Sequence, residues 1–208
     1  LAARISFINE IAGLCEVAGA DVEEVVQGMG YDPRIGHAYL QPGLGFGGPC
    51  LEKDLTALIL MAEGNGHNPQ LLKSVLERNN IQVSDLLGKL KELCGHLLHR
   101  KTVAVFGLAF KAGTNDVRSS LALNVIDQLQ QEGATVQAFD PVAIPEAKTI
   151  RPDLLYFDDP YEAVERADAL LVLTEWPCFT ELDFERIKAR MASPCIVDGR
   201  NLLDSQMV

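Results

Sequence analysis

The sequence is short of positive charge: 18 lysines and arginines face 29 aspartates and glutamates, so the formal net charge is −11 at pH 7. This balance argues against nucleic acid or an anionic membrane surface as the partner. The sequence also lacks an apolar run long enough to span a bilayer, and no secretory signal opens it. Its hydrophobic content of 48% is nevertheless ordinary for a globular protein with a substantial core.

Cysteines with paired spacing are missing as well. The five cysteines are scattered, odd in number and without a Cys-x-x-Cys pair; they are Cys15, Cys50, Cys94, Cys178 and Cys195. The four histidines show no metal-ligand spacing either. We therefore expect neither a disulfide framework nor a zinc site, and we predict a cytoplasmic, reducing compartment.

The chain opens on Leu1 rather than on methionine, and its first residues have the pattern of a helix interior. Ile5, Ile8 and Ile11 recur at helical spacing, and no capping residue precedes them. We expect from this that the chain is part of a longer protein.

Residues 1 to about 99 are predicted to be helical. Asp21 followed by Glu24 has the spacing of a capping box and marks the start of one of the helices. Residues 30–49 hold many glycines and prolines and are predicted to form one long loop, and loops longer than about 12–15 residues are usually functional. The predicted helices are 1–17, 21–28, 51–63 and 69–96.

From Lys101 the pattern changes to short, continuous apolar runs that alternate with helical segments. Such runs are typical of strands buried on both faces of a parallel sheet. The predicted strands are 102–107, 135–140, 169–173 and 195–198, with helices at 119–131, 160–166 and 183–191. The sequence therefore predicts an α/β chain: a helical domain over 1–99 and a doubly wound, Rossmann-like parallel sheet over 100–208, with ligands at the carboxyl ends of its strands.

A cysteine follows a glycine-rich stretch at the end of the long loop. Glycines allow the backbone to approach a ligand closely, and Cys50 comes just before a predicted helix, whose start favours a thiolate. Lys53 adds a positive charge, and Asp54 follows one turn along the same face. A cysteine alone is more often a buried small hydrophobe, but this context favours covalent chemistry by Cys50. The other four cysteines are expected in the core.

Three cationic residues are each compatible with two interpretations, a solvated surface position or a contact with a ligand. Lys111 follows the first predicted strand, Arg200 follows the last, and Arg34 lies in the long loop. The sequence Gly107-x-Ala109 is not a full dinucleotide-binding fingerprint and by itself is weak support for such a ligand.

The stretch Gly45-Phe46-Gly47-Gly48-x-Cys50-x-x-Lys53-Asp54 resembles the catalytic motif of the UDP-glucose/GDP-mannose dehydrogenase family. Other segments look like family segments in the same order, namely 5–10, 19–22, 32–36, 107–111 and 198–202. The resemblance covers essentially the whole chain. The Gly-Phe-Gly-Gly form, with Pro49 where relatives that oxidise N-acetylated sugars tend to carry histidine, favours UDP-glucose as the substrate.

The resemblance implies the second and third parts of a three-part enzyme. These are a helical domain that forms a homodimer and an α/β domain that binds UDP, whereas the NAD-binding domain would lie before Leu1. The implied reaction oxidises the sugar C6 hydroxyl to a carboxylate in two hydride transfers to NAD, through a thiohemiacetal and a thioester on Cys50. Without its NAD domain the chain is expected to be inactive.

The same resemblance assigns roles to individual residues. Asp54 would position or activate water, Lys53 would support the local charge, and Arg34 would reach the substrate of the neighbouring subunit. NAD would meet Cys50 and Arg118. The implied substrate-binding residues are Arg34, Tyr39, Gln41, Gly43, Gly45, Phe46, Gly47, Gly48, Phe110, Lys111 and Arg200. Two alternatives stay open: a 6-dehydrogenase for GDP-mannose or a UDP-N-acetylhexosamine, and a non-catalytic module that binds nucleotide sugars.

Overall fold

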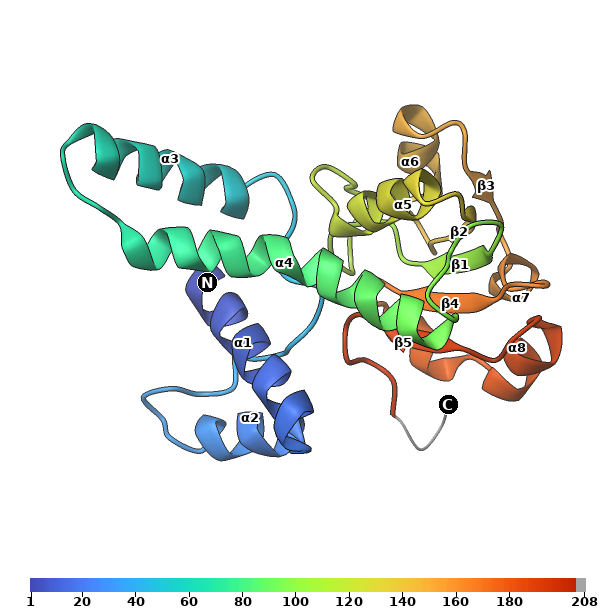
Figure 1. Cartoon of the computed structure of the whole chain (residues 1–208), viewed down its shortest axis with the longest axis horizontal. Helices are drawn as coiled ribbons and strands as arrows, with labels where there is room; N and C mark the ends of the chain where they lie inside the picture. The colour runs from blue at the N-terminus through green and yellow to red at the C-terminus, as the bar shows by residue number, and fades with distance from the viewer. Residues whose placement is uncertain (205–208) are drawn as a thin grey trace. The chain divides into compact units, whose positions relative to one another are not determined.

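A computed structural model describes residues 1–204 and divides the chain into two compact units (Figure 1). The first unit is Leu1–Gln82 and the second begins at Val83. The division falls inside the helix α4 (Gln70–Leu93), upstream of the boundary near residue 100 that the sequence suggested. The assignment of 1–99 and 100–208 to separate domains stays a prediction.

The first unit is helical, as predicted, and contains α1 (Ala2–Ala18), α2 (Val22–Gly30), α3 (Leu51–Gly64) and the beginning of α4. Asp21 caps α2, but its carboxylate accepts from the amide of Glu23 at 2.7 Å rather than from that of Glu24, as a capping box would require. Residues 31–50 contain no helix or strand, as the glycines and prolines indicated.

The core of the first unit includes residues of its long loop. Phe46 packs in a cluster with Leu55 and Ile59 of α3 and Val75 of α4. Leu40 and Leu44 of the loop are also buried. The loop is therefore anchored by its own apolar side chains, and α3 begins from a fixed point.

The second unit is a doubly wound α/β fold, and all its strand pairs are parallel. The strand order is β3-β2-β1-β4-β5, so the chain moves outward from β1 in both directions. The bounds are β1 (Thr102–Phe106), β2 (Thr135–Phe139), β3 (Leu155–Tyr156), β4 (Ala169–Val172) and β5 (Ile196–Asp198). The predicted fold class is confirmed.

Helices cover both faces of this sheet, with α5 and α8 on opposite sides of the strands (Figure 1). The helices of the second unit are α5 (Leu121–Gln131), α6 (Ile144–Ile150), α7 (Pro160–Ala163), η1 (Pro177–Glu181, a 3₁₀ helix) and α8 (Phe184–Arg190). The sequence did not predict α6, β3 or η1. The helix predicted to end at His96 stops at Leu93, because Gly95 and His96 both have positive φ.

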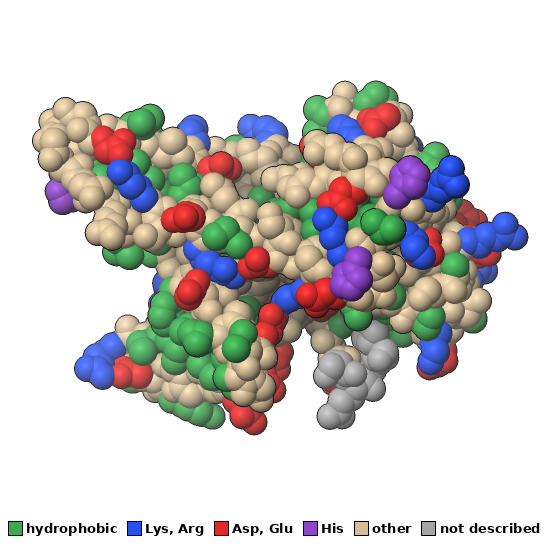
Figure 2. Space-filling view, viewed as in Figure 1, with side chains coloured by type: hydrophobic (Ala, Val, Ile, Leu, Met, Phe, Trp, Pro, Cys, Tyr) green, Lys and Arg blue, Asp and Glu red, His purple; other side chains and the backbone are tan. Residues whose placement is uncertain are grey.

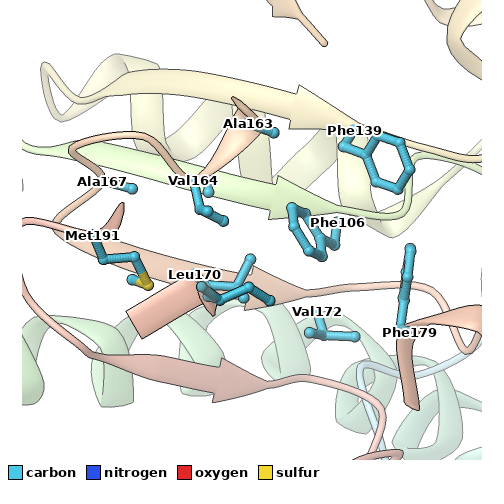
Figure 3. Close-up of a cluster of buried hydrophobic side chains, with 11 residues drawn as sticks. Phe106, Phe139, Ala163, Val164, Ala167, Leu170, Val172, Phe179 and Met191 are labelled. Carbon is cyan, nitrogen blue, oxygen red and sulfur yellow. The ribbon is translucent and has the colours of Figure 1, made fainter. Parts of the chain in front are cut away.

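Three phenylalanine rings form the centre of the core on the α8 side of the sheet (Figure 3). The ring of Phe106 lies 5.4 Å from that of Phe139 and 5.5 Å from that of Phe179, measured between centroids. Leu170 and Met191 extend the same cluster. Because strand side chains alternate between faces, this packing fixes the register that brings the carboxyl ends of β1, β2 and β4 together. No helix among residues 1–204 is both long and apolar enough to cross a membrane.

A carboxylate near the start of the sheet gives a test of its stability. Asp168 accepts from the Thr102 amide at 2.8 Å and from Lys101 Nζ at 2.9 Å. Burial alone would raise the pKa of Asp168, but these two bonds outweigh it and hold the pKa below its usual value. The carboxylate therefore stabilises the fold above about pH 4, and this contribution is lost as the pH falls through the lowered pKa.

We predict that Asp168→Asn lowers the free energy of unfolding by about 1 kcal/mol at pH 7, measured by urea denaturation. The deficit relative to the unsubstituted chain should shrink as the pH falls below about 4. Asp158→Asn makes the same change at an exposed position of the same unit and should leave stability nearly unchanged. A deficit that grew on acidification would contradict this account of Asp168.

Candidate functional site

The glycine-rich segment before α3 is held by amide side chains from α1 and α4. Asn9 Oδ1 accepts from the Gly43 amide at 2.8 Å, and Gln82 Nε2 donates to the Gly43 carbonyl at 2.6 Å. Asn79 bonds both backbone groups of Phe46, accepting from its amide at 2.7 Å and donating to its carbonyl at 3.0 Å. Asn9 and Asn79 are buried. The segment therefore has one defined path in the described structure.

Two glycines allow this path. Gly45 has φ 104° and Gly48 has φ 87°, values that a residue with a side chain rarely adopts. Their backbone lies directly before Cys50. A side chain at either position would strain the segment that positions the cysteine.

Cys50 is exposed and forms the N-cap of α3. Its carbonyl accepts from the Asp54 amide at 2.9 Å, so the first helical turn is closed. Lys53 and Asp54 are both exposed, and their charged groups pair at 3.3 Å. This places a thiol, an ammonium and a carboxylate within the first turn of a 14-residue helix, where the helix dipole favours negative charge.

The other cysteines lie in different surroundings. Cys15 is buried, as expected, and Cys94 and Cys195 are partly buried with their thiols hydrogen-bonded to each other. Burial raises the pKa of Cys94 and raises that of Cys195 to about 11. The expectation that Cys178 lies in the core is wrong: it is exposed on η1, although desolvation of its thiol raises its pKa. It was misplaced because no local pattern around Cys178 indicated a 3₁₀ helix.

The earlier part of the long loop presents polar side chains to solvent. Arg34, Tyr39 and Gln41 are exposed. Arg34 pairs with Asp32 at 2.6 Å, which raises the pKa of the guanidinium. Arg4 of α1 donates to the loop at the carbonyls of residues 35 and 36. The loop is thus tied to α1 at its middle.

In the second unit, the candidate residues follow β1 and β5. Lys111 is exposed, with its Nζ 5.6 Å from the centroid of the Phe110 ring. The Arg200 side chain points into the unit: Nε donates to the Leu173 carbonyl at 2.8 Å and lies 3.3 Å from Glu175 Oε2. Burial lowers the pKa of Arg200, although the neighbouring carboxylates oppose this. The structure therefore shows Arg200 engaged inside the protein.

The turn after β1 does not offer a cradle for a dinucleotide. In dinucleotide-binding folds the amides of this turn point at a pyrophosphate. Here the amides of Leu108 and Ala109 donate to the carboxylate of Asp140, at 2.7 Å and 3.1 Å. Arg118, the residue that the resemblance assigns to NAD, is exposed and pairs with Asp116 at 2.6 Å. Within residues 1–204, then, Arg118 is an exposed cation paired with Asp116, and the amides of this turn do not form an open pyrophosphate site.

Two cavities of the second unit lie near β2 and β3. One of about 530 Å³ opens at the carboxyl end of β2 and is lined in part by Asp140, Pro141 and Lys148. Another of about 400 Å³ shares Lys148 and lies along β3. Neither is lined by Lys111 or Arg200. No group of three or more His, Cys, Asp or Glu residues in the described part of the chain could hold a metal ion.

Sequence reasoning therefore found the cysteine turn but not the residues that support it. Cys50, Lys53 and Asp54 come together in the first unit, whereas Lys111 and Arg200 belong to the second. The missed residues are Asn9, Asn79, Gln82, Asp140 and Glu175. The signal that could have found Asn9 and Asn79 is an asparagine at a core-facing position of a helix, since a buried amide requires a partner.

Comparisons with known proteins cover nearly the whole chain. The model of the central domain of the UDP-glucose/GDP-mannose dehydrogenase family matches residues 1–81, and the model of its UDP-binding domain matches residues 104–205. The chain is 48% identical over 203 residues to a UDP-glucose 6-dehydrogenase of Bacillus subtilis, covering 97% of this chain and 44% of that protein. It is 45% identical over 208 residues to the enzyme of that name from Pseudomonas aeruginosa, covering 97% and 46%. The chain thus spans about half the length of the curated relatives it matches.

Solved structures of nucleotide-sugar dehydrogenases are also similar to this chain. A UDP-glucose dehydrogenase from Pyrobaculum islandicum matches with a TM-score of 0.90 at 35% identity, covering 97% of this chain and 45% of that one. A UDP-D-ManNAc dehydrogenase from Pyrococcus horikoshii matches with a TM-score of 0.84 at 28% identity, covering 98% and 46%.

The cysteines should differ in reactivity. We predict that iodoacetamide at pH 7.5 modifies Cys50 before the other four, measured by peptide mass spectrometry over time. Cys195 should react at least roughly tenfold more slowly, because each unit of raised pKa cuts the thiolate fraction about tenfold. Cys178 is the internal control, since it is exposed but has a raised pKa. Faster labelling of Cys178 than of Cys50 would contradict this prediction.

The support for the glycine-rich segment can be tested at α4. Asn79→Ala removes two hydrogen bonds to Phe46 and should lower the free energy of unfolding by about 2 kcal/mol. It should also speed cleavage within residues 31–50 in limited proteolysis. Asn80→Ala is the matched control, because Asn80 is the exposed neighbour on the same helix. Equal effects of the two substitutions would show that Asn79 does not hold the segment.

Proposed function

The chain belongs to the UDP-glucose/GDP-mannose dehydrogenase family, and we propose that it is the central and UDP-binding part of a UDP-glucose 6-dehydrogenase. The observation that carries this proposal is the exposed Cys50 on the first turn of α3, next to Lys53 and Asp54. A protein that only bound nucleotide sugars would have no need of this constellation. The identity of 48% to a relative named for that activity supports UDP-glucose as the substrate.

In the proposed reaction Cys50 is the nucleophile. Oxidation of the sugar C6 hydroxyl gives an aldehyde, and the Cys50 sulfur adds to its carbonyl carbon to form a thiohemiacetal. Loss of a second hydride and of the hydroxyl proton turns this adduct into a thioester. Water then breaks the C–S bond, which releases the carboxylate and restores the thiol. NAD, when bound, supplies the acceptor for both hydrides.

Asp54 and Lys53 would serve the steps that involve water and charge. Asp54 lies one turn after the thiol, and as a general base it would take a proton from the attacking water. Lys53, already paired with Asp54 at 3.3 Å, would keep that carboxylate oriented and offset negative charge on the adduct. The backbone of Gly43, Gly45, Gly47 and Gly48 would line the sugar, since glycines permit close approach.

The second unit would bind the nucleotide. Lys111 supplies an exposed ammonium for a phosphate, and the neighbouring Phe110 ring supplies an apolar surface. Arg200 Nη2 lies 3.4 Å from the Phe110 carbonyl, so its proposed contribution to substrate binding includes fixing this segment. Arg118 would approach NAD.

We also propose that the first unit forms a homodimer through α1. Large apolar side chains on this helix are exposed, including Phe7, Leu14 and Val17, the last at 92% of its full exposure. Positions 7, 14 and 17 fall on one side of the helix. Figure 2 shows hydrophobic side chains gathered over the helices of this unit. Arg34, also exposed, would then reach the substrate of the neighbouring subunit.

A second candidate is a 6-dehydrogenase for an N-acetylated UDP-sugar or GDP-mannose. The likeness to the UDP-D-ManNAc dehydrogenase of Pyrococcus horikoshii supports this second substrate class, although the identity is lower at 28%. A panel of nucleotide sugars assayed with the complete protein separates these substrates.

The decisive experiment counts NADH in the complete protein that contains this chain. We predict about two NADH formed per UDP-glucose consumed, because an alcohol is taken to a carboxylate. Cys50→Ser should lower turnover at least about a thousandfold, as expected when a nucleophile is removed. Thermal unfolding should be almost unaffected, because Cys50 is exposed.

Cys178→Ser is the matched control for this substitution, since Cys178 is exposed in the other unit. It should leave turnover within about twofold of the unsubstituted enzyme. Full activity of Cys50→Ser would overturn the proposed mechanism. One NADH per sugar would show that the reaction stops at the aldehyde.

A further inference from the structure

The segment Gly107–Ala112 after β1 is held by residues that follow β4 and β5, and by Asp140 at the end of β2. Thr174, after β4, donates its hydroxyl to the Ala109 carbonyl at 2.7 Å. Glu175 accepts from the Ala112 amide at 3.3 Å, and Arg200, after β5, reaches the Phe110 carbonyl. Gly107 has φ 94°, and a Cβ there would lie 2.4 Å from Thr174 Cβ, so the turn packs directly on β4. Contacts within the protein alone therefore define the conformation of this segment.

Asp140, at the end of β2, is the centre of this arrangement. Its side chain is buried at 2% exposure and meets N–H donors through both carboxylate oxygens. Oδ2 accepts from Leu108 N at 2.7 Å, Ala109 N at 3.1 Å and Trp176 Nε1 at 3.2 Å, and Oδ1 accepts from Val142 N at 2.9 Å and Ala143 N at 2.8 Å. A carboxylate accepts through both oxygens, whereas the NH₂ of asparagine would face these donors with another donor.

The two amides of the β1 turn are those that doubly wound folds commonly turn towards a phosphate. Because Asp140 already occupies them, a second anion there would meet a buried negative charge. A diphosphate would therefore be directed to the exposed cation of the same segment, Lys111. The position of Lys111 depends on the backbone at Ala109, two residues earlier, whose amide is bound by Asp140.

We infer that Asp140 is a positioning residue for nucleotide binding: it fills the amide cradle at the end of β1, excludes phosphate from it and fixes the segment that presents Phe110 and Lys111. This inference rests on the proposed function, since it assumes that the second unit binds UDP. It predicts that UDP binds a preformed segment without displacing Asp140.

The test uses Asp140→Asn and UDP. Affinity is measured by calorimetry, and Trp176 serves as a reporter because it is the one tryptophan of the chain. Asp140→Asn should weaken UDP binding at least tenfold and shift the emission of Trp176, whose indole donates to Asp140. The matched control is Ile187→Ala, which leaves a cavity in the core at α8 and lowers the unfolding temperature without touching the segment.

Below their unfolding temperatures, Ile187→Ala should bind UDP within twofold of the unsubstituted chain. If Asp140→Asn is folded and also binds within twofold, the inference is overturned. If both variants lose affinity in proportion to their lost stability, Asp140 has only a structural role and the inference is again overturned. Failure of the unsubstituted chain to bind UDP would instead overturn the proposed function of the second unit.

Hydrogen exchange on the unsubstituted chain tests the inference even if Asp140→Asn does not fold. The amides of Leu108 and Ala109 should be protected without UDP, and UDP should change their exchange less than twofold. Amides that exchange freely in the absence of UDP and become protected on its addition would show that the nucleotide, not Asp140, fills the cradle. That result would overturn the inference.

Discussion

Hydrogen bonds from side chains on helices or just after strand ends to the backbone of two irregular segments are the interactions on which both candidate sites depend. A buried amide or carbonyl without a partner costs about 1–3 kcal/mol, and in both segments side chains supply partners for backbone groups that lie outside helices and strands. The donor and acceptor groups of each side chain match the backbone groups that it bonds. Asn79 both donates and accepts, and it meets the carbonyl and the amide of Phe46, whereas Asp140 only accepts and meets a group of N–H donors.

The strands of the second unit could be predicted because β1 and β4 are apolar at nearly every position, which only burial on both faces explains. The elements that were missed are short and give weaker signals. The edge strand Leu155–Tyr156 has two residues and no alternation to detect. The helix Ile144–Ile150 has seven residues, carries Pro145 near its start and buries Ile144 and Ala147, so its own propensity is a weak signal. Tertiary packing determines whether such short elements form, and the local sequence pattern carries no information about that packing.

The same limit applies to the sites. Cys50, Lys53 and Asp54 lie within one helical turn, so their proximity can be predicted from spacing alone. Asn79 lies 33 residues from Phe46, and Asp140 lies 32 residues from Leu108. Bonds of this kind depend on which elements become neighbours, and they appear only once the fold is known. Sequence reasoning therefore identifies groups that can react more readily than groups that hold them in place.

The charge of the chain explains why fixed cations matter here. A net charge of −11 opposes an anionic nucleotide at long range, but salt screens exposed charges beyond about 8 Å at physiological ionic strength. Attraction must therefore come from cations very near the ligand. Arg200 is committed to Leu173 and Glu175 inside the protein, which leaves Lys111 as the exposed cation of the β1 segment. Nucleotide binding therefore depends on where the backbone places the Lys111 ammonium. The carboxylate of Asp140 holds that backbone through the amides of Leu108 and Ala109.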